Sequence, residues 1–214
     1  ATEDLEVVLR HISTQYEYDE LALVGFSLGG NLILKYLGDG LFTVSDKIKG
    51  AAAVSVPCDL KSCAVKLASP SNALYMQYFL RSLRKKIRLK TRMFPGMIDD
   101  DGFEKIKTFT GFDDRYTAPL HGFADASDYY AKCGCGGYLS GIRRKTLLIN
   151  ALDDPFLTSA CFPCEAAEKS EYLHLETPKW GGHVGFVQFR NNGEYWHETR
   201  AASFICNESS PRAA

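Results

Sequence analysis

Hydrophobic and polar positions along the chain alternate between short apolar runs and amphipathic segments. Apolar residues recur at helical spacing in residues 2–16, and the later runs are mostly apolar throughout, which is typical of parallel strands buried on both faces. The predicted strands are residues 21–25, 51–56, 145–152 and, more weakly, 171–177. Further helices are predicted for residues 31–37, 124–133 and 195–206. This alternation indicates an α/β fold, with helices flanking a mostly parallel sheet.

Composition narrows the class of protein. The chain has 214 residues, of which 45% are hydrophobic, and a formal net charge of -1, so one sizeable core is expected and no electrostatic footprint for nucleic acid is present. No apolar run approaches the roughly 20 residues of a membrane span. The seven cysteines are odd in number, which favours free thiols in a reducing compartment. We expect a cytoplasmic or peripheral membrane location.

A serine flanked by glycines lies between the first predicted strand and the helix after it. In VGFSLGGN, Gly25, Ser27 and Gly29 form the pattern Gly-x-Ser-x-Gly, which is typical of a nucleophile elbow. We expect a strained backbone at Ser27, with the two glycines preventing clashes on either side. The helix dipole and the backbone N–H of Leu28 would then stabilise an oxyanion.

The later chain offers partners that could activate this serine. A hydroxyl needs a base to take its proton, and behind such an elbow the acid and then the histidine follow in the sequence. Asp153 and Asp154 come after the third predicted strand; Asp154 is the predicted acid because it directly precedes Pro155 at the turn, and Asp153 is the alternative. His183, on the glycine-flanked loop KWGGHVGF, is the predicted base.

The other histidines and the cysteines have simpler interpretations. His121 begins an HGF motif that resembles an oxyanion donor, but that motif precedes an elbow and His121 follows it. Surface or partly buried imidazoles are expected at His11, His174 and His197. Two cysteine pairs could offer thiolates to zinc: Cys133 with Cys135, and Cys161 with Cys164. Because these pairs come from different loops and one has an unusual spacing, no metal is predicted, and the serine chemistry requires no cofactor.

Four separated motifs together resemble the AB hydrolase 4 family over nearly the whole chain: GFSLGGN, FDDRYTAPLHGFADASDYY, NALDDPF and GGHVGF. The family includes bacterial esterases, plant embryogenesis-associated proteins, yeast medium-chain fatty-acid ethyl ester synthases and animal hydrolases that act on phospholipids. The resemblance implies an α/β-hydrolase fold, with the catalytic serine at Ser27, the acid at Asp154 and the histidine at His183. It also implies ester chemistry on acyl lipids or short- to medium-chain esters.

Other functions use the same residues and stay open. An acyltransferase or ester synthase would replace water by an alcohol, and peptidases and thioesterases have the same triad. A non-catalytic scaffold on the hydrolase fold is the rival class, because a fold does not dictate function. The intact serine, aspartate and histidine favour the enzyme.

The segment before the elbow is short for this family, whose members carry further strands and a loop with a second oxyanion N–H there. We therefore expect the chain to be a fragment that lacks the N-terminal strands and is inactive alone. Loss of one oxyanion donor lowers turnover by on the order of 10² to 10³. The first predicted strand would also have an apolar edge.

We expect one partial catalytic domain over residues 1–214. Residues 1–57 carry the elbow, about 58–120 form a helical lid without strands, about 121–207 carry the acid and the histidine, and 208–214 form a frayed tail.

A basic amphipathic stretch, RSLRKKIRLKTR, occupies residues 81–92 of the predicted lid. It could lay the lid on an anionic membrane and present lipid to the site. The residues for that contact are Arg81, Arg84, Lys85, Lys86 and Arg88. The favoured alternative is a solvated lid face, whose charge the nearby Asp99, Asp100 and Asp101 could neutralise.

Overall fold

The computed structural model describes residues 2–188 and 193–206, so the predicted tail 208–214 lies outside the described residues. The chain divides into two compact units. Unit 1 comprises residues 1–59 and 133–214, and unit 2 is Leu60–Lys132. Most of the segment predicted as a lid belongs to unit 2, and its role as a lid stays a prediction.

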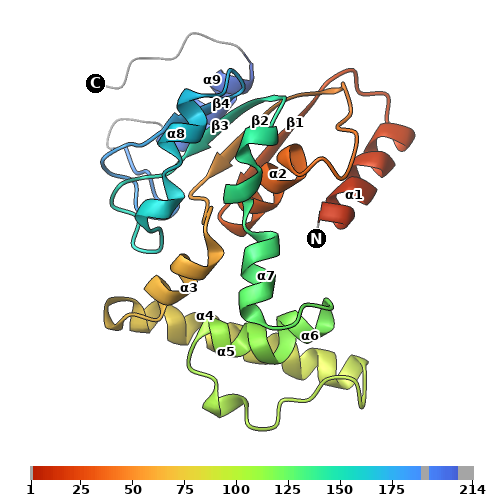
Figure 1. The fold of residues 1–214 in the computed structure, drawn as a ribbon, viewed down its shortest axis with the longest axis vertical. Helices are drawn as coiled ribbons and strands as arrows, with labels where there is room; N and C mark the ends of the chain where they lie inside the picture. Colours follow the sequence, from red (N-terminus) through yellow and green to blue (C-terminus); the bar gives the residue numbers. More distant parts are fainter. Residues whose placement is uncertain (1, 189–192, 207–214) are drawn as a thin grey trace. The chain divides into compact units, whose positions relative to one another are not determined.

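Unit 1 is built on a four-stranded sheet in the order β1-β2-β3-β4, with all neighbours parallel (Figure 1). The strands are β1 (Leu21–Phe26), β2 (Ile48–Val54), β3 (Lys145–Ile149) and β4 (Leu173–Glu176). All four lie where strands were predicted, and β2 ends at Val54 rather than Val56 because Ser55 turns the chain with a φ of 57°. Register aligns Phe26, Val54 and Ile149, so the loops after these strands meet at one edge of the sheet.

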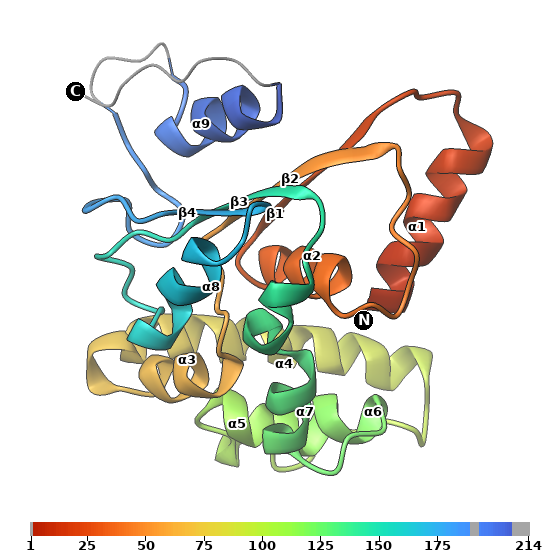
Figure 2. The ribbon, with the colours of Figure 1, turned by 45° about the horizontal axis from the view of Figure 1, so that its top comes forward.

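Helices cover both faces of this sheet (Figure 2). The helices of unit 1 are α1 (Thr2–Gln15), α2 (Leu28–Gly38), α8 (Cys164–Glu168) and α9 (Trp196–Ile205). Helix α2 packs on β1 and β2, and α9 packs on β2 and β3 from the opposite face. Helix α1 packs on α2, where the Tyr36 hydroxyl donates to Glu6 Oε2 at 2.8 Å.

Strand β1 differs from the prediction of a strand buried on both faces. Leu23 and Gly25 are buried, whereas Val24 is 50% exposed and Phe26 is 41% exposed. The physical reason is position, because β1 pairs with β2 alone among the described strands and α9 packs instead on β2 and β3. Strand β2 is buried from Gly50 to Val54 and forms the centre of the core.

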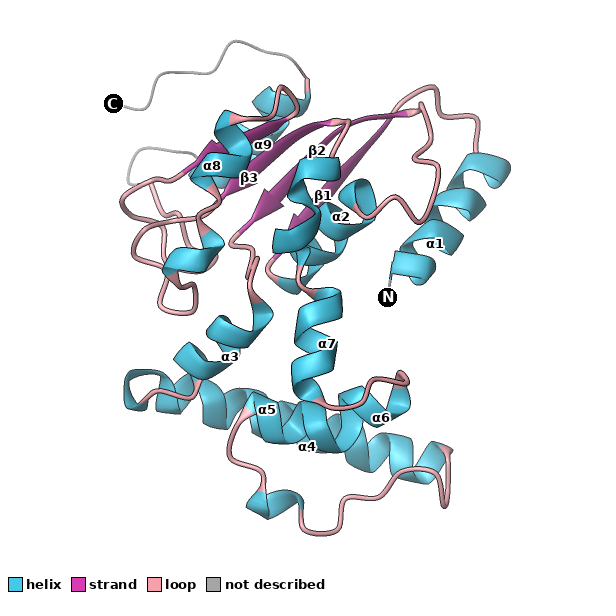
Figure 3. Ribbon diagram, in the orientation of Figure 1, coloured by secondary structure: helices cyan, strands magenta, loops and turns pink. Residues whose placement is uncertain are grey.

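Unit 2 is helical, and its residues, all of them described, include no strand (Figure 3). Its main helices are α3 (Leu60–Leu67), α4 (Ala73–Met93), α5 (Phe109–Phe112), α6 (Ala118–Leu120) and α7 (Ala126–Cys133), with a π-helix at Asp113–Thr117. A separate core forms from Ile87, Phe103, Phe112 and Tyr116. Among the described residues, no helix is both long enough and apolar enough to cross a membrane.

Candidate active site

Ser27 occupies a sharp turn between β1 and α2. Its φ of 51° and ψ of -121° are unusual for a residue with a side chain, because a Cβ crowds the backbone at positive φ. Backbone hydrogen bonds hold it there: Ser27 N donates to Val54 O at 2.8 Å, and Asn31 N donates to Ser27 O at 3.0 Å. The strained conformation expected at an elbow is therefore present, and the neighbouring strand helps to enforce it.

The glycines around Ser27 are not equivalent, which corrects the sequence-based interpretation. A Cβ on Gly25 would lie 2.7 Å from the carbonyl carbon and oxygen of Gly29, so glycine is required there. A Cβ on Gly29 would meet nothing within 4 Å. The second crowded position is Gly30, where a Cβ would lie 2.6 Å from Val56 Cγ2. The close approach of α2 to the sheet thus depends on Gly25 and Gly30.

His183 links Ser27 to Asp154. Its Nε2 lies 3.0 Å from Ser27 Oγ, and its Nδ1 lies 2.8 Å from Asp154 Oδ2. Asp154 is 3% exposed, and its Oδ1 accepts a hydrogen bond from Phe156 N at 2.8 Å. Because the carboxylate accepts at Nδ1, the favoured tautomer has its proton on Nδ1 and a lone pair on Nε2. The three residues singled out in the sequence therefore lie together in unit 1.

Asp153, the alternative acid, has a different position. Its side chain is exposed, and its Oδ1 accepts a hydrogen bond from Gly182 N at 2.9 Å. Asp153 thus binds the backbone of the histidine loop rather than the imidazole. The two neighbouring carboxylates hold one loop at two points, Asp154 at the His183 ring and Asp153 at the main chain beside it.

Two aromatic residues that the sequence analysis did not single out support His183. The Phe156 ring packs on the imidazole, with centroids 4.7 Å apart. Phe186 has a φ of 44° and is 3% exposed, and its N donates to Gly181 O at 2.9 Å, which closes the loop. A Cβ on Gly181 would lie 2.5 Å from Phe186 Cε1. The GGH glycines were the only signal for this packing.

Two buried polar residues on neighbouring loops, Asn150 and Ser55, were not predicted from the sequence. Asn150 is fully buried; its Oδ1 accepts from Val56 N at 2.7 Å, and its Nδ2 donates to Cys161 O at 2.7 Å. It therefore ties the loop after β2 to the loop after β3. Ser55, also fully buried and at positive φ, follows β2 as Ser27 follows β1. An asparagine after a buried strand was the available signal for the first of these.

The remaining histidines lie away from this relay. His11 and His174 are exposed, and His121 is exposed at the end of α6 in unit 2. His197, expected to be at most partly buried, is only 4% exposed because its ring packs against Phe26 and Phe186. Burial lowers the pKa of His197, so the neutral imidazole is favoured inside unit 1.

The site has features suited to acyl chemistry. Leu28 is the first residue of α2, so its N–H has no acceptor within the helix and is available to an oxyanion. Among the described residues, no three side chains of histidine, cysteine, aspartate or glutamate gather as metal ligands. The four cysteines weighed for zinc form no disulfide bond within the described part of the chain, and Cys164 is exposed. The arrangement can therefore transfer a proton from a hydroxyl to an imidazole that a buried carboxylate orients.

The fold and this site are typical of α/β-hydrolases, and comparisons with known proteins agree. The phospholipase ABHD3 of Bos taurus is 32% identical over 188 residues, which cover 87% of this chain and 45% of the relative. YheT of Escherichia coli (strain K12) is 31% identical over 87% of this chain and 54% of its own length. The monoacylglycerol lipase ABHD2 of Bos taurus is 29% identical over 87% of this chain and 47% of its own length. The chain thus spans about half the length of these curated relatives.

Solved structures show the same fold at lower identity. The Pyrococcus furiosus esterase Pf2001 matches with a TM-score of 0.56 at 14% identity, over 98% of this chain and 62% of the esterase. A Mycobacterium tuberculosis puromycin-hydrolyzing peptidase matches with a TM-score of 0.52 at 16% identity, over 96% of this chain and 23% of the peptidase. No protein-family model matches the chain. The recognition from the motifs is nevertheless confirmed: the chain has a portion of the α/β-hydrolase fold, and it is similar to abhydrolase-domain proteins.

Proposed function

We propose that the protein is a serine hydrolase of carboxylic esters, acting on acyl lipids or on short- to medium-chain esters. Ser27 is the nucleophile, His183 the general base and Asp154 the orienting acid. The observation that carries the proposal is the continuous relay from Ser27 Oγ through the imidazole to a buried carboxylate, at 3.0 and 2.8 Å. Relatives named phospholipase and monoacylglycerol lipase support esters of lipids as the substrate class.

In the first half-reaction, the Nε2 lone pair of His183 takes the proton of Ser27 as Oγ attacks the acyl carbonyl carbon. Asp154 accepts a hydrogen bond from the Nδ1–H and stabilises the imidazolium that forms. The Leu28 N–H donates to the developing oxyanion at the start of α2, where the helix dipole has the favourable sign. His183 then returns the proton to the departing alcohol, which leaves an acyl group on Ser27.

In the second half-reaction, His183 takes a proton from water, whose oxygen attacks the acyl carbonyl carbon. The bond from that carbon to Ser27 Oγ then breaks, His183 returns the proton to Oγ, and the acid is released. An alcohol in the place of water would give a new ester by the same steps, so ester synthesis is the alternative outcome. Hydrolysis ranks first because the relatives are named for lipase and phospholipase activity. Product analysis with and without added ethanol separates the two reactions.

A lipid substrate has to reach the site from a membrane or a micelle. The protein meets it by peripheral contact through the basic segment of α4, for which the sequence names Arg81, Arg84, Lys85, Lys86 and Arg88. This contact is a part of the proposal that does not depend on the ester chemistry.

Labelling by a fluorophosphonate probe, followed by hydrolysis of p-nitrophenyl esters of increasing chain length, tests the chemistry. Ser27→Ala is expected to abolish labelling and to lower kcat by about 10⁴-fold or more. Ser55→Ala is the matched control, because Ser55 is also a serine at positive φ, after the neighbouring strand. It is expected to keep the label.

Labelling that survives Ser27→Ala and disappears with Ser55→Ala would contradict the proposal, because the nucleophile would then be Ser55 after β2 and not Ser27 after β1. Absence of labelling and turnover in this chain alone agrees with the expected loss of one oxyanion donor, whereas their absence in a folded protein that carries the complete fold would favour the non-catalytic scaffold. A wild-type enzyme that cleaves only amides would replace esters by peptides as the substrate class.

A further inference from the structure

Helix α4 has two chemically different sides. Met76 and Ile87 are buried on the side that packs within unit 2. A repeat of 3.6 residues per turn aligns six residues on the opposite side, called here the outer face of α4: Leu74, Tyr78, Arg81, Lys85, Leu89 and Arg92. All six are exposed, and Leu74, Tyr78 and Leu89 have exposed fractions of 81%, 70% and 58%. The outer face is therefore apolar and basic at once.

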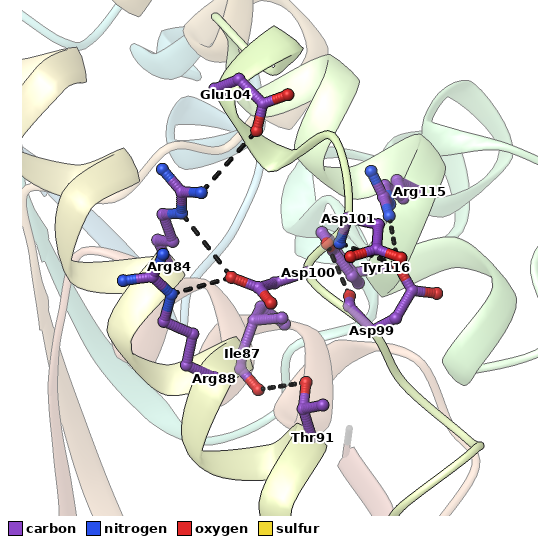
Figure 4. A network of polar contacts seen from close by, with 10 residues as sticks. All are labelled: Arg84, Ile87, Arg88, Thr91, Asp99, Asp100, Asp101, Glu104, Arg115 and Tyr116. Carbon is purple, nitrogen blue, oxygen red and sulfur yellow. Dashed lines mark hydrogen bonds and ion pairs between the residues drawn. The ribbon is translucent and has the colours of Figure 1, made fainter.

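Acidic residues of unit 2 engage two basic residues at the side of α4, Arg84 and Arg88 (Figure 4). Asp100 Oδ2 lies 2.8 Å from Arg88 Nε and 3.8 Å from Arg84 Nε, and Glu104 lies 3.7 Å from Arg84. Two of the five residues named for membrane contact, Arg84 and Arg88, are thus engaged inside unit 2. Of that set, Arg81, Lys85 and Lys86 form no ion pair with the described residues.

The other basic residues of α4 keep their charge available. Arg81, Lys85, Lys86, Lys90 and Arg92 are exposed and form no ion pair with any described residue. Helix α4 contains no acidic residue in its 21 positions. Met93, beside Leu89 at the same end of the helix, is 60% exposed and adds to the apolar surface.

We infer that the outer face of α4 docks on an anionic lipid surface, with Leu74, Tyr78 and Leu89 entering the headgroup region and Arg81, Lys85 and Arg92 contacting lipid phosphates. Interfacial helices combine apolar and basic side chains in this way. A nucleic acid would match the charge but leave the leucines in water. A second copy of the face would set like charges against one another. The inference refines the membrane contact proposed above and is independent of the ester chemistry.

Cosedimentation of the full chain with vesicles tests the docking. Binding is expected to vesicles of phosphatidylcholine mixed with phosphatidylglycerol, to be much weaker with phosphatidylcholine alone, and to decrease with added salt. Arg81→Glu with Lys85→Glu is expected to weaken binding at least about tenfold, since each basic residue near an anionic surface strengthens binding roughly fivefold. Lys49→Glu with Lys61→Glu is the matched control, because both lysines are exposed outside α4. This control should bind the anionic vesicles more strongly than the variant with Arg81→Glu and Lys85→Glu.

The apolar part has its own pair of variants. Leu74→Ser with Leu89→Ser is expected to weaken binding several-fold, whereas Val7→Ser with Leu41→Ser, exposed by 67% and 62% in unit 1, should not. Thermal unfolding checks that each variant folds, which is expected because every substituted side chain is exposed.

Three results would overturn the inference: no binding of the wild-type chain to anionic vesicles, equal loss in test and control variants, or a dimer in solution that the α4 substitutions abolish. The last would assign the face to a second copy. Turnover of a soluble short ester is measured in parallel. Vesicle binding without turnover would support the docking surface and give the proposed function no support in this chain. Turnover without vesicle binding would support the proposed function and overturn the docking surface.

Discussion

Asp154 in unit 1 is held by short contacts inside the protein, whereas Asp100 in unit 2 is held by long side chains at the surface. Asp154 is 3% exposed and is bound by the His183 ring and by a backbone N–H. Asp100 lies between Arg84 and Arg88, with its side chain 26% exposed. Loops at the end of a parallel sheet can fix a side chain through the backbone, whereas flexible arginines on a helix supply charge without a rigid geometry.

This difference suggests how each unit responds to substitution. In unit 1, the strained turn at Ser27 and the closed loop around His183 depend on atoms in direct contact, so a single methyl group has a large effect. In unit 2, the ion pairs lie in water and are individually weak. Function and stability should therefore be more sensitive in unit 1.

The largest expected effect is on turnover and compares two neighbouring carboxylates of unit 1. Asp154→Asn keeps the shape but removes the acceptor that orients Nδ1–H, and it should lower kcat by about 10⁴-fold. Asp153→Asn affects only the hydrogen bond to Gly182 N and should lower kcat by less than about tenfold. Steady-state kinetics on a soluble ester measures both. Equal losses would show that the two roles are not distinct.

An intermediate effect is expected on stability at the turn around Ser27. Gly25→Ala places a Cβ 2.7 Å from the Gly29 backbone and should reduce the free energy of unfolding by about 3 kcal/mol, as overpacking does. Gly29→Ala meets no neighbour and should leave stability unchanged or raise it by up to about 1 kcal/mol, because alanine favours helices. Denaturant titration of both variants provides the measurement, and a stable Gly25→Ala would contradict the packing described.

The smallest effect is expected in unit 2, at Asp100. The hydrogen bond and charge of Arg88, with a further contribution from Arg84, lower the pKa of Asp100. Stabilisation by a carboxylate with a lowered pKa is complete above its unfolded pKa of about 3.9 and is lost as the pH falls through the folded pKa. Asp100→Asn should therefore lower the melting temperature slightly at neutral pH, by less than Gly25→Ala does, and the difference from wild type should vanish in acid. A difference that grows in acid would exclude the ion pair as its cause.

Much of unit 1 could be predicted because its signals are local. The apolar runs that became β1 to β4 and the pattern around Ser27 depend on residues adjacent in the sequence. The exposed face of β1 could not be predicted, because the burial of a strand depends on which elements pack beside it. The role of Gly29 was assigned wrongly, and that of Gly30 was not predicted, for a related reason: crowding at α2 comes from Gly25 and Val56, which approach only when α2 packs on the sheet.

By itself, the sequence determined the class of fold and the identity of three candidate residues, because a nucleophile elbow and loops after parallel strands have local signatures. Only the tertiary structure shows which of Asp153 and Asp154 contacts the imidazole, since both follow the same strand. Their side chains point in different directions, Asp154 to His183 Nδ1 and Asp153 to the Gly182 N–H. It likewise divided the basic residues of α4 into those that Asp100 and Glu104 engage and those that form no ion pair with the described residues. Such choices depend on distances of a few ångströms between segments that are far apart in the chain, which no pattern of neighbouring residues encodes.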